Sequence, residues 1–274
     1  MFIEGDDHFD FPLQGHDIKR SLVMEKFKKI DELLEILNHL RPLTTDELHY
    51  IDAKMRIEHV WSSTALEGNT INEEETAWIL LDGLTVSGHP LREHFEVKAT
   101  DLAYLQMMDL VKKKVELTEA MIKELNKTVT TFTQTNLDRW GHYRKVLVYP
   151  FGGDKHAYTP WQEISSEMEK LVSWLNQDKS HPVERAALLH LKFVKIHPFV
   201  DGNGRCARLL MNLILVRHGY PVINIQPDET SRFNYIQALK KSQSENDDSV
   251  FINLIINYVE QALRQRIDWI GIDQ

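Results

Sequence analysis

The chain has 274 residues, of which 42% are hydrophobic and 27% are charged, enough apolar material for a sizeable globular core. A formal net charge of -9 argues against nucleic acid as the main partner, because phosphate backbones are bound by clustered Lys and Arg. The single cysteine, Cys206, excludes an intramolecular disulfide. Neither a secretory leader nor an apolar run of about 18 residues is visible. We therefore expect a cytoplasmic protein without a membrane partner.

Apolar residues recur at three- and four-residue spacing over most of the chain, which is typical of amphipathic helices. Thr44 with Glu47, and Asn72 with Glu75, form capping-box patterns at the start of two of these helices. The predicted helices span residues 17–40, 44–61, 72–83, 90–112, 118–130, 161–175, 182–196, 204–218, 229–243 and 248–266. The sequence thus predicts a mostly all-α helical bundle with an N-terminal helical extension.

One segment has a β-type pattern. Residues 145–149 alternate in the manner of a strand, Gly152 and Gly153 supply turn residues, and residues 156–159 could form a returning strand. We expect a short β-hairpin here and call residues 146–158 the flap.

The most informative stretch is residues 196–208, Ile-His-Pro-Phe-Val-Asp-Gly-Asn-Gly-Arg-Cys-Ala-Arg. Pro198 should end the preceding helix. Gly202 and Gly204 surround Asn203 in a tight turn, after which a new helix begins. The free N–H groups and the positive dipole end of that helix would face the turn, which favours binding of an anion such as phosphate.

The charged side chains around this turn suit a phosphate-containing ligand. Arg205 and Arg208 lie three residues apart and can share a helix face, where their guanidinium groups could hold phosphates. Asp201 is the ligand type that Mg²⁺ prefers, and His197 can accept a proton near neutral pH. Each feature alone would be ordinary turn chemistry or a structural histidine. Their joint occurrence within residues 197–208 indicates a site.

This stretch resembles the signature of the Fic family, His-Pro-Phe-x-Asp/Glu-Gly-Asn-Gly-Arg-x-x-Arg, at every fixed position. The resemblance extends over about residues 140–243, includes Gly141 to Arg144 before the flap, and is weaker on both sides. The chain looks most like bacterial relatives of the animal endoplasmic-reticulum Fic proteins, and we expect neither the membrane anchor nor the tetratricopeptide repeats of the animal proteins.

The resemblance implies a Fic fold and a protein adenylyltransferase that moves AMP from ATP to a Ser, Thr or Tyr hydroxyl. His197 would be the general base, and Asp201 would bind Mg²⁺. The implied nucleotide-binding residues are Gly202, Asn203, Gly204, Arg205, Arg208 and Tyr235. A protein target would pair with the flap by strand addition.

Residues 63–69, Ser-Thr-Ala-Leu-Glu-Gly-Asn, resemble the inhibitory motif of the same family. Ser63 and Glu67 are one helical turn apart, and Gly68 suits a helix end. The resemblance implies that Glu67 pairs with Arg208, displaces a phosphate contact and holds ATP in a non-productive pose. We therefore divide the chain into an N-terminal helical region (1–90) that carries this motif and a catalytic domain (91–274).

Alternatives remain open at this point. The same site could transfer another phosphate-containing group, or it could belong to a regulatory module that only senses nucleotide. The intact His197 and Gly-Asn-Gly turn favour an enzyme. The target protein, the direction of the reaction (Glu67 could also assist removal of AMP) and the presence of a homodimer are left undecided by the sequence.

Overall fold

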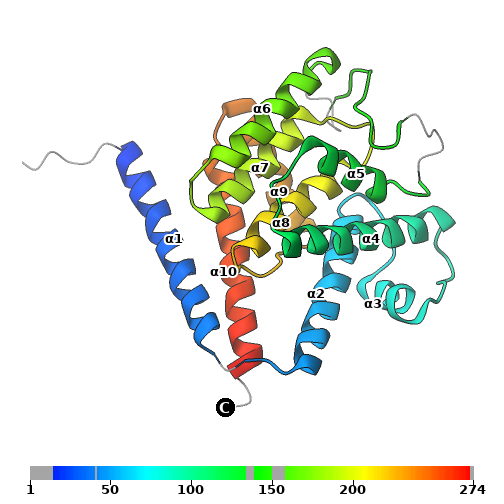
Figure 1. Cartoon of the computed structure of the whole chain (residues 1–274), viewed down its shortest axis with the longest axis horizontal. Coiled ribbons are helices and arrows are strands. Elements are labelled where there is room, and N and C mark those ends of the chain that lie inside the picture. Colours follow the sequence, from blue (N-terminus) through cyan, green and yellow to red (C-terminus); the bar gives the residue numbers. More distant parts are fainter. Residues whose placement is uncertain (1–14, 41, 134–138, 150–157, 272–274) are drawn as a thin grey trace, which may run out of the picture.

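A computed structural model describes residues 15–40, 42–133, 139–149 and 158–271, and side chains from residue 23 onward. Helices make up most of the described chain (Figure 1). Their bounds are α1 (Gly15–His39), α2 (Thr45–Ala65), α3 (Glu73–Ala77), the π-helical turn η1 (Trp78–Asp82), α4 (Leu91–Lys113), α5 (Glu119–Val129), the 3₁₀ turn η3 (Trp161–Glu163), α6 (Ile164–Gln177), α7 (Pro182–Ile196), α8 (Asn203–Arg217), α9 (Glu229–Glu245) and α10 (Ser249–Gly271).

The predicted helices are confirmed to within a few residues at their ends. Both capping boxes form: Thr44 and Glu47 exchange side-chain and backbone hydrogen bonds at α2, and Asn72 and Glu75 do so at α3. The helix expected to stop near Trp61 continues to Ala65, because no helix-breaking residue precedes Gly68. This extra turn places Ser63 within α2.

The hairpin prediction is not borne out where it can be examined. Residues 145–149 form no strand, and residues 150–157 lie outside the described part of the chain. An isolated two-stranded hairpin is marginally stable without a further strand or a helix to pack on. The carbonyl oxygen of Val146 instead accepts a hydrogen bond of 2.6 Å from Nη1 of Arg144.

The helical hairpin of α7 and α8 forms the centre of the molecule (Figure 1). Every residue of α8 from Arg205 to Leu215 is buried, so this part has no solvent-facing stripe, as expected for a helix surrounded by others. Helices α4, α5, α6, α9 and α10 pack around this pair. The two ends of α7 and α8 that meet at residues 197–202 are therefore held from several sides.

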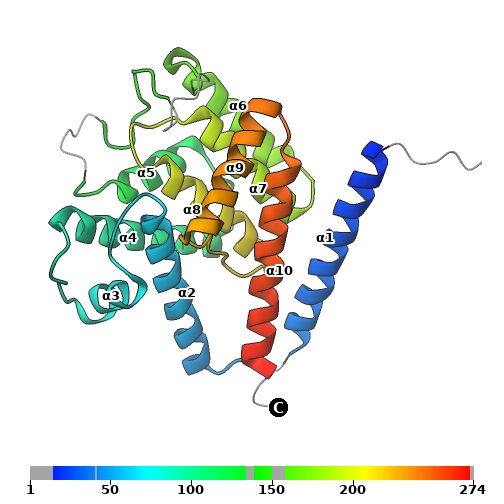
Figure 2. The ribbon, with the colours of Figure 1, turned by 180° about the vertical axis from the view of Figure 1, so that it is seen from behind.

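The N-terminal helices pack on the outside of this core. Helix α1 runs beside α10 at one edge of the molecule, and α2 packs on α4 and touches α8 (Figure 2). The Phe27 ring of α1 stacks on the His181 ring at a centroid distance of 4.1 Å. The C-terminal end of α2 thereby reaches the start of α8, although the two segments are about 140 positions apart in sequence.

Candidate functional site

His197 ends α7 in a left-handed backbone conformation, with φ 50° and ψ 58°. Such a conformation is unusual for a residue with a side chain and often marks a functional position. The imidazole ring stacks on the Tyr158 ring at a centroid distance of 3.8 Å and an interplanar angle of 10°. Burial, and secondly the charge of Arg144, lowers the pKa of His197 from 6.5 to about 4. The ring is therefore neutral at pH 7 and able to accept a proton.

The turn between α7 and α8 is braced by side chains. Gly202 has φ 79°, where a side chain would be strained, and it caps the N-terminus of α8. The Asn203 side chain accepts from the Phe199 N–H at 3.0 Å and donates to the Phe199 carbonyl at 2.8 Å. Nδ2 of Asn126 donates to the Asp201 carbonyl at 2.8 Å. The side chain of Asn203 is thus engaged by the loop, which leaves its backbone amide as its donor toward a ligand.

The two signature arginines have different partners. Arg208, only 4% exposed, donates from Nε to Ser63 Oγ at 2.9 Å and from Nη2 to the Ser63 carbonyl at 2.8 Å and Glu67 Oε1 at 2.7 Å. Arg205 donates from Nη1 to the Val129 carbonyl at 3.1 Å and from Nη2 to Asp201 Oδ1 at 3.3 Å. Arg208 therefore faces α2, and Arg205 links the end of α5 to the turn. Of the two arginines, Arg208 lines the cavity described below and Arg205 does not.

The Glu67 carboxylate lies at the N-terminus of α8. A methyl group placed on Gly204 would lie 2.1 Å from Glu67 Oε1, so the carboxylate occupies the space directly above this glycine. The side chain as a whole is 45% exposed. Removal of the carboxyl from water would raise its pKa, but the Arg208 guanidinium outweighs this effect, and the pKa lies below its ordinary value. An ionised carboxylate thus sits where the helix end favours an anion.

The end of α2 is fixed by contacts further up the helix. Arg56 pairs with Asp101 of α4 through two hydrogen bonds, one of them 2.7 Å from Nη2 to Oδ2. Nδ1 of His59 lies 3.0 Å from Oδ1 of Asn224, which follows α8. Gly68, with φ 100°, lets the chain turn away after the helix. Ser63 and Glu67 are therefore presented to Arg208 by a helix that is docked elsewhere.

A cavity of about 260 Å³ lies among these groups. It is lined by Leu66, Glu67, Tyr158, Val194, His197, Gly204, Arg208, Arg232, Tyr235, Ile236, Leu239, Lys240 and Gln243. The Tyr235 hydroxyl lies 3.1 Å from Nε2 of His190 in the wall of this cavity. One end of the cavity carries the arginine and the helix N-terminus, and leucine and isoleucine side chains contribute apolar surface. Such a combination fits a ligand with an anionic part and a flat apolar part.

Asp201 has the chemistry of a metal ligand. Its side chain is 36% exposed, and within the described residues both of its hydrogen bonds use Oδ1. One carboxylate together with substrate phosphates and water is a usual donor set for Mg²⁺, so Asp201 fits the expected role. Among the described residues, no group of three or more His, Cys, Asp or Glu side chains could hold a metal by itself.

Three residues of this site were not predicted to take part in it. Arg144 is fully buried beneath His197, Tyr158 stacks on its ring, and Asn126 holds the Asp201 carbonyl. The family resemblance included Arg144, but nothing in the sequence predicted that its side chain would be buried. Tyr158 and Asn126 come from segments far from the signature.

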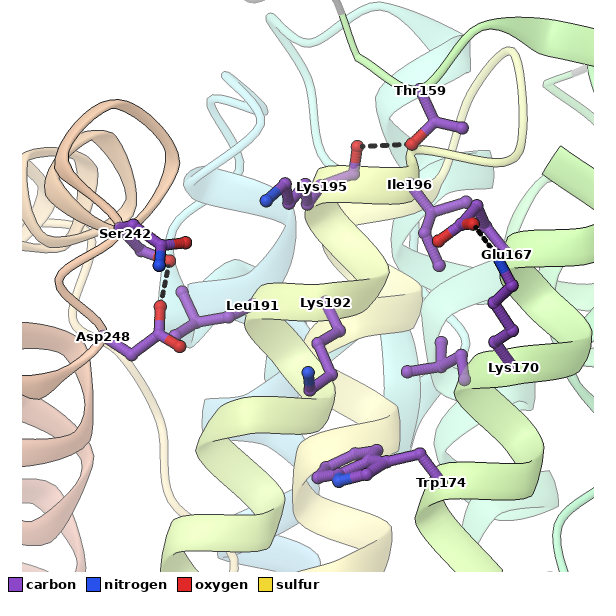
Figure 3. A pocket seen from close by; sticks show the side chains of 12 residues that line it. Thr159, Glu167, Lys170, Trp174, Leu191, Lys192, Lys195, Ile196, Ser242 and Asp248 are labelled. Atoms are coloured by element: carbon purple, nitrogen blue, oxygen red, sulfur yellow. Dashed lines mark hydrogen bonds and ion pairs between the residues drawn. The ribbon is translucent and has the colours of Figure 1, made fainter. Parts of the chain in front are cut away.

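A second cavity, of about 340 Å³, lies beside the flap end between α6, α7 and the α9–α10 turn (Figure 3). Several of its charged groups already have partners: Glu167 pairs with Lys170, and Ser242 donates to Asp248. Lys192 lies over the Trp174 ring at 5.0 Å. The signature residues do not line this cavity, so the first cavity is the candidate site.

No helix in the part of the chain described here combines the length and apolar character that crossing a bilayer requires.

The chain is similar to known proteins over most of its length. Residues 116–215 match the model of the Fic/DOC family. Protein adenylyltransferase Fic of Drosophila melanogaster is 31% identical over 250 residues, which cover 90% of this chain and 49% of that protein. The chain thus spans about half the length of the curated relatives it matches. A Fic domain containing signalling protein of Bacteroides thetaiotaomicron is 30% identical, with a TM-score of 0.80 over 90% of this chain and 98% of that one. Fic-1 of C. elegans (residues 134–508) is 27% identical, with a TM-score of 0.81 over 94% of this chain and 76% of that one.

Proposed function

The chain belongs to the Fic/DOC family, and on this premise we propose that it is a protein adenylyltransferase that moves AMP from ATP to a protein hydroxyl group. The observation that carries the proposal is the imidazole of His197 in the lining of a cavity that Gly204 at the N-terminus of α8 and Arg208 also line. Relatives named protein adenylyltransferase Fic support the reaction.

In the proposed reaction the target hydroxyl attacks the α-phosphorus of ATP. His197 accepts the hydroxyl proton, the new oxygen–phosphorus bond forms, and the bond to the β-phosphate breaks with release of pyrophosphate. The backbone amides from Gly202 to Arg205 would hold phosphate oxygens at the helix end, as for phosphoryl transfer in general. Mg²⁺ held by Asp201 would neutralise phosphate charge when it is bound. The Tyr235 side of the cavity would receive the base.

We also propose that Glu67 inhibits the enzyme. Support comes from its carboxylate, which lies above Gly204 and pairs with Arg208 at 2.7 Å. A phosphate group would need the same space and the same guanidinium. The pair need not be strong to inhibit, since it has to outcompete only one phosphate contact. Whether the same carboxylate also helps to remove AMP is a further part of this proposal, because a carboxylate beside the phosphate could orient water.

The partners in this proposal are ATP and a protein target bound at the flap, in the cytoplasm. A homodimer is supported by large apolar side chains that are exposed on η1, in the loop after it and at the start of α4, namely Trp78, Leu81, Leu84 and Leu91. Sedimentation of wild-type and Leu81→Asp protein tests the dimer: a shift to the monomer mass only in the variant supports it, and a monomeric wild type contradicts it.

The reaction is tested by incubating the protein with Mg²⁺ and ATP that carries label on either the α- or the γ-phosphate. Wild type, Glu67→Gly, Glu67→Gln and Glu67→Gly/His197→Ala are compared. Protein labelled only from α-labelled ATP, strongly with Glu67→Gly and not with the double variant, supports AMP transfer and inhibition together. Glu67→Gln is the matched control, because it keeps the shape of the side chain and removes its charge.

Other results favour the alternatives. Label from γ-labelled ATP would indicate transfer of a phosphate group instead of AMP. Binding of ATP without label on any variant would indicate a nucleotide-sensing module. Equal labelling of wild type and Glu67→Gly would remove the inhibitory role of Glu67 and leave the transferase proposal intact.

A further inference from the structure

Arg144 is a buried cation that has no carboxylate partner among the residues the structure describes. Its side chain is 2% exposed. Its four side-chain hydrogen bonds all end on backbone carbonyl oxygens. Burial lowers the pKa of Arg144 from its ordinary value, but an arginine remains charged in proteins. Burial of such a charge is costly, so its position calls for an explanation beyond packing.

Two hydrogen bonds connect Arg144 to the consecutive backbone carbonyl groups of His197 and Pro198. Nε donates to the His197 carbonyl at 2.7 Å, and the Arg144 N–H donates to the Pro198 carbonyl at 2.9 Å. Nη2 also reaches the Ile196 carbonyl at 3.4 Å. These bonds hold the residue whose left-handed backbone aims the imidazole into the cavity.

The same guanidinium binds the backbone where the flap begins, at Val146, and directly after it ends, at Thr159. Nη1 donates to the Val146 carbonyl at 2.6 Å, and Nη2 donates to the Thr159 carbonyl. Thr159 is in turn attached to the end of α7, where its hydroxyl lies 3.4 Å from the Lys195 carbonyl (Figure 3). Its neighbour Tyr158 stacks on the His197 ring.

We propose that Arg144 is a positioning residue that holds both ends of the flap against the backbone of His197. It thereby fixes the position of a target segment bound at the flap relative to the general base, His197. The inference rests on the proposed transferase activity for its kinetic test. A planar guanidinium suits this task, because its five donors spread in fixed directions toward several carbonyl oxygens. A lysine ammonium at this place would keep the charge but could not span the same set of acceptors.

The test compares Arg144→Met and Arg144→Lys in the Glu67→Gly background. Loss of the guanidinium group should lower kcat by about 100-fold in both variants, since displacement of a reacting group by about 1 Å has this effect. The Kd for ATP should stay unchanged, because Arg144 does not line the nucleotide cavity.

The pH profile separates charge from geometry. The Arg144 charge helps to keep the pKa of His197 low, so its removal should raise that pKa. The acid limb of the kcat/KM profile should therefore move to higher pH in Arg144→Met and stay in place in Arg144→Lys. A purely structural role would lower the melting temperature and would not separate the two variants in this way.

Arg217→Met is the matched control, because Arg217 is a partly buried arginine that donates to the Leu110 carbonyl at 3.1 Å, away from the flap. Its kcat and acid limb should equal those of the parent. Should Arg144→Met fail to fold, Arg144→Lys still tests the kinetic expectation. A parental kcat in folded Arg144→Lys, or a loss of ATP affinity that matches the loss of kcat, overturns the proposal.

Hydrogen exchange provides a readout that does not need activity. Arg144→Lys should accelerate exchange in peptides that contain residues 145–149 and 158–159, and Arg217→Met should not. If hydrogen exchange in these peptides is unchanged, the proposal that Arg144 holds the flap is wrong, even if AMP transfer is observed. Absence of AMP transfer in the Glu67→Gly parent would refute the transferase proposal. The hydrogen-exchange result would still test whether Arg144 holds the flap.

Discussion

Gly204 offers a direct way to ask whether Glu67 and a phosphate group use the same space. An alanine methyl group at this position would lie 2.1 Å from Glu67 Oε1 and 3.1 Å from Nη1 of Arg208. Ordinary contacts need about 3.5 Å, so any group in the place of the carboxylate oxygen would have to move by more than about 1 Å. Gly204→Ala should therefore separate Glu67 from Arg208 without activating the enzyme, because the methyl group also excludes phosphate.

The magnitude follows from this displacement. A shift of about 1 Å in a reacting group lowers the rate by about 100-fold, which corresponds to about 2.7 kcal/mol in the activation free energy. We expect kcat/KM of Glu67→Gly/Gly204→Ala to lie about 100-fold below that of Glu67→Gly. Alanine has the higher helix propensity, so the substitution itself should not unfold α8.

Initial rates with α-labelled ATP, ATP affinity and melting temperature of Glu67→Gly, Gly204→Ala and the double variant provide the assay. The double variant should melt no lower than Glu67→Gly and bind ATP more weakly. If it transfers AMP as fast as Glu67→Gly, the carboxylate and the phosphate do not share this space, and the structural account of inhibition is wrong.

Two further predictions concern the surroundings of the site. Asp101→Asn removes the negative charge that pairs with Arg56 and replaces one of its two acceptor oxygens by an NH₂ donor, so it should lower the free energy of unfolding by about 1–3 kcal/mol. By loosening α2 it should raise AMP transfer in otherwise wild-type protein and leave Glu67→Gly unchanged; an equal rise in both would contradict this. Burial, and to a smaller extent the charge of Arg208, lowers the pKa of His190 to about 3. As pH falls below 6.5 the unfolded chain binds a proton that the folded protein excludes, so stability should fall by up to about 1.4 kcal/mol per pH unit. Urea unfolding of wild type and His190→Gln at pH 7 and pH 5 measures this, and an equal decrease in both proteins would contradict it.

Local patterns were sufficient for most of the helices. The capping residues Thr44 and Asn72 act through neighbours three positions away, so their role is visible in any short stretch of sequence. The flap was harder to predict, because strand formation depends on a partner strand that the chain itself need not supply. Val146 shows this, since its carbonyl binds an arginine instead of a ladder partner.

The site was predictable where it is contiguous and not where it is assembled from distant segments. His197, Asp201 and the turn glycines lie in one stretch, and the pairing of Glu67 with Arg208 followed from a family resemblance. The orientation of Arg205 toward the Val129 carbonyl depends on where α5 ends, which no local pattern contains. The burial of Arg144 likewise depends on several carbonyl oxygens that only the folded chain brings together.

The three hydrogen bonds that Arg208 makes with the end of α2 and with Glu67, just beyond it, also bear on how fast the proposed inhibition could be relieved. Two of them end on Ser63, including its backbone carbonyl, and only one ends on Glu67. A rotation of the Glu67 side chain would free the space above Gly204 while Ser63 still orients the guanidinium. Exposed side chains change rotamer within picoseconds to nanoseconds, whereas release of a docked helix takes microseconds or longer. The fraction of time that the site is open would then be set by the rotamer populations of one side chain, and a ligand or partner could tune it without moving the backbone.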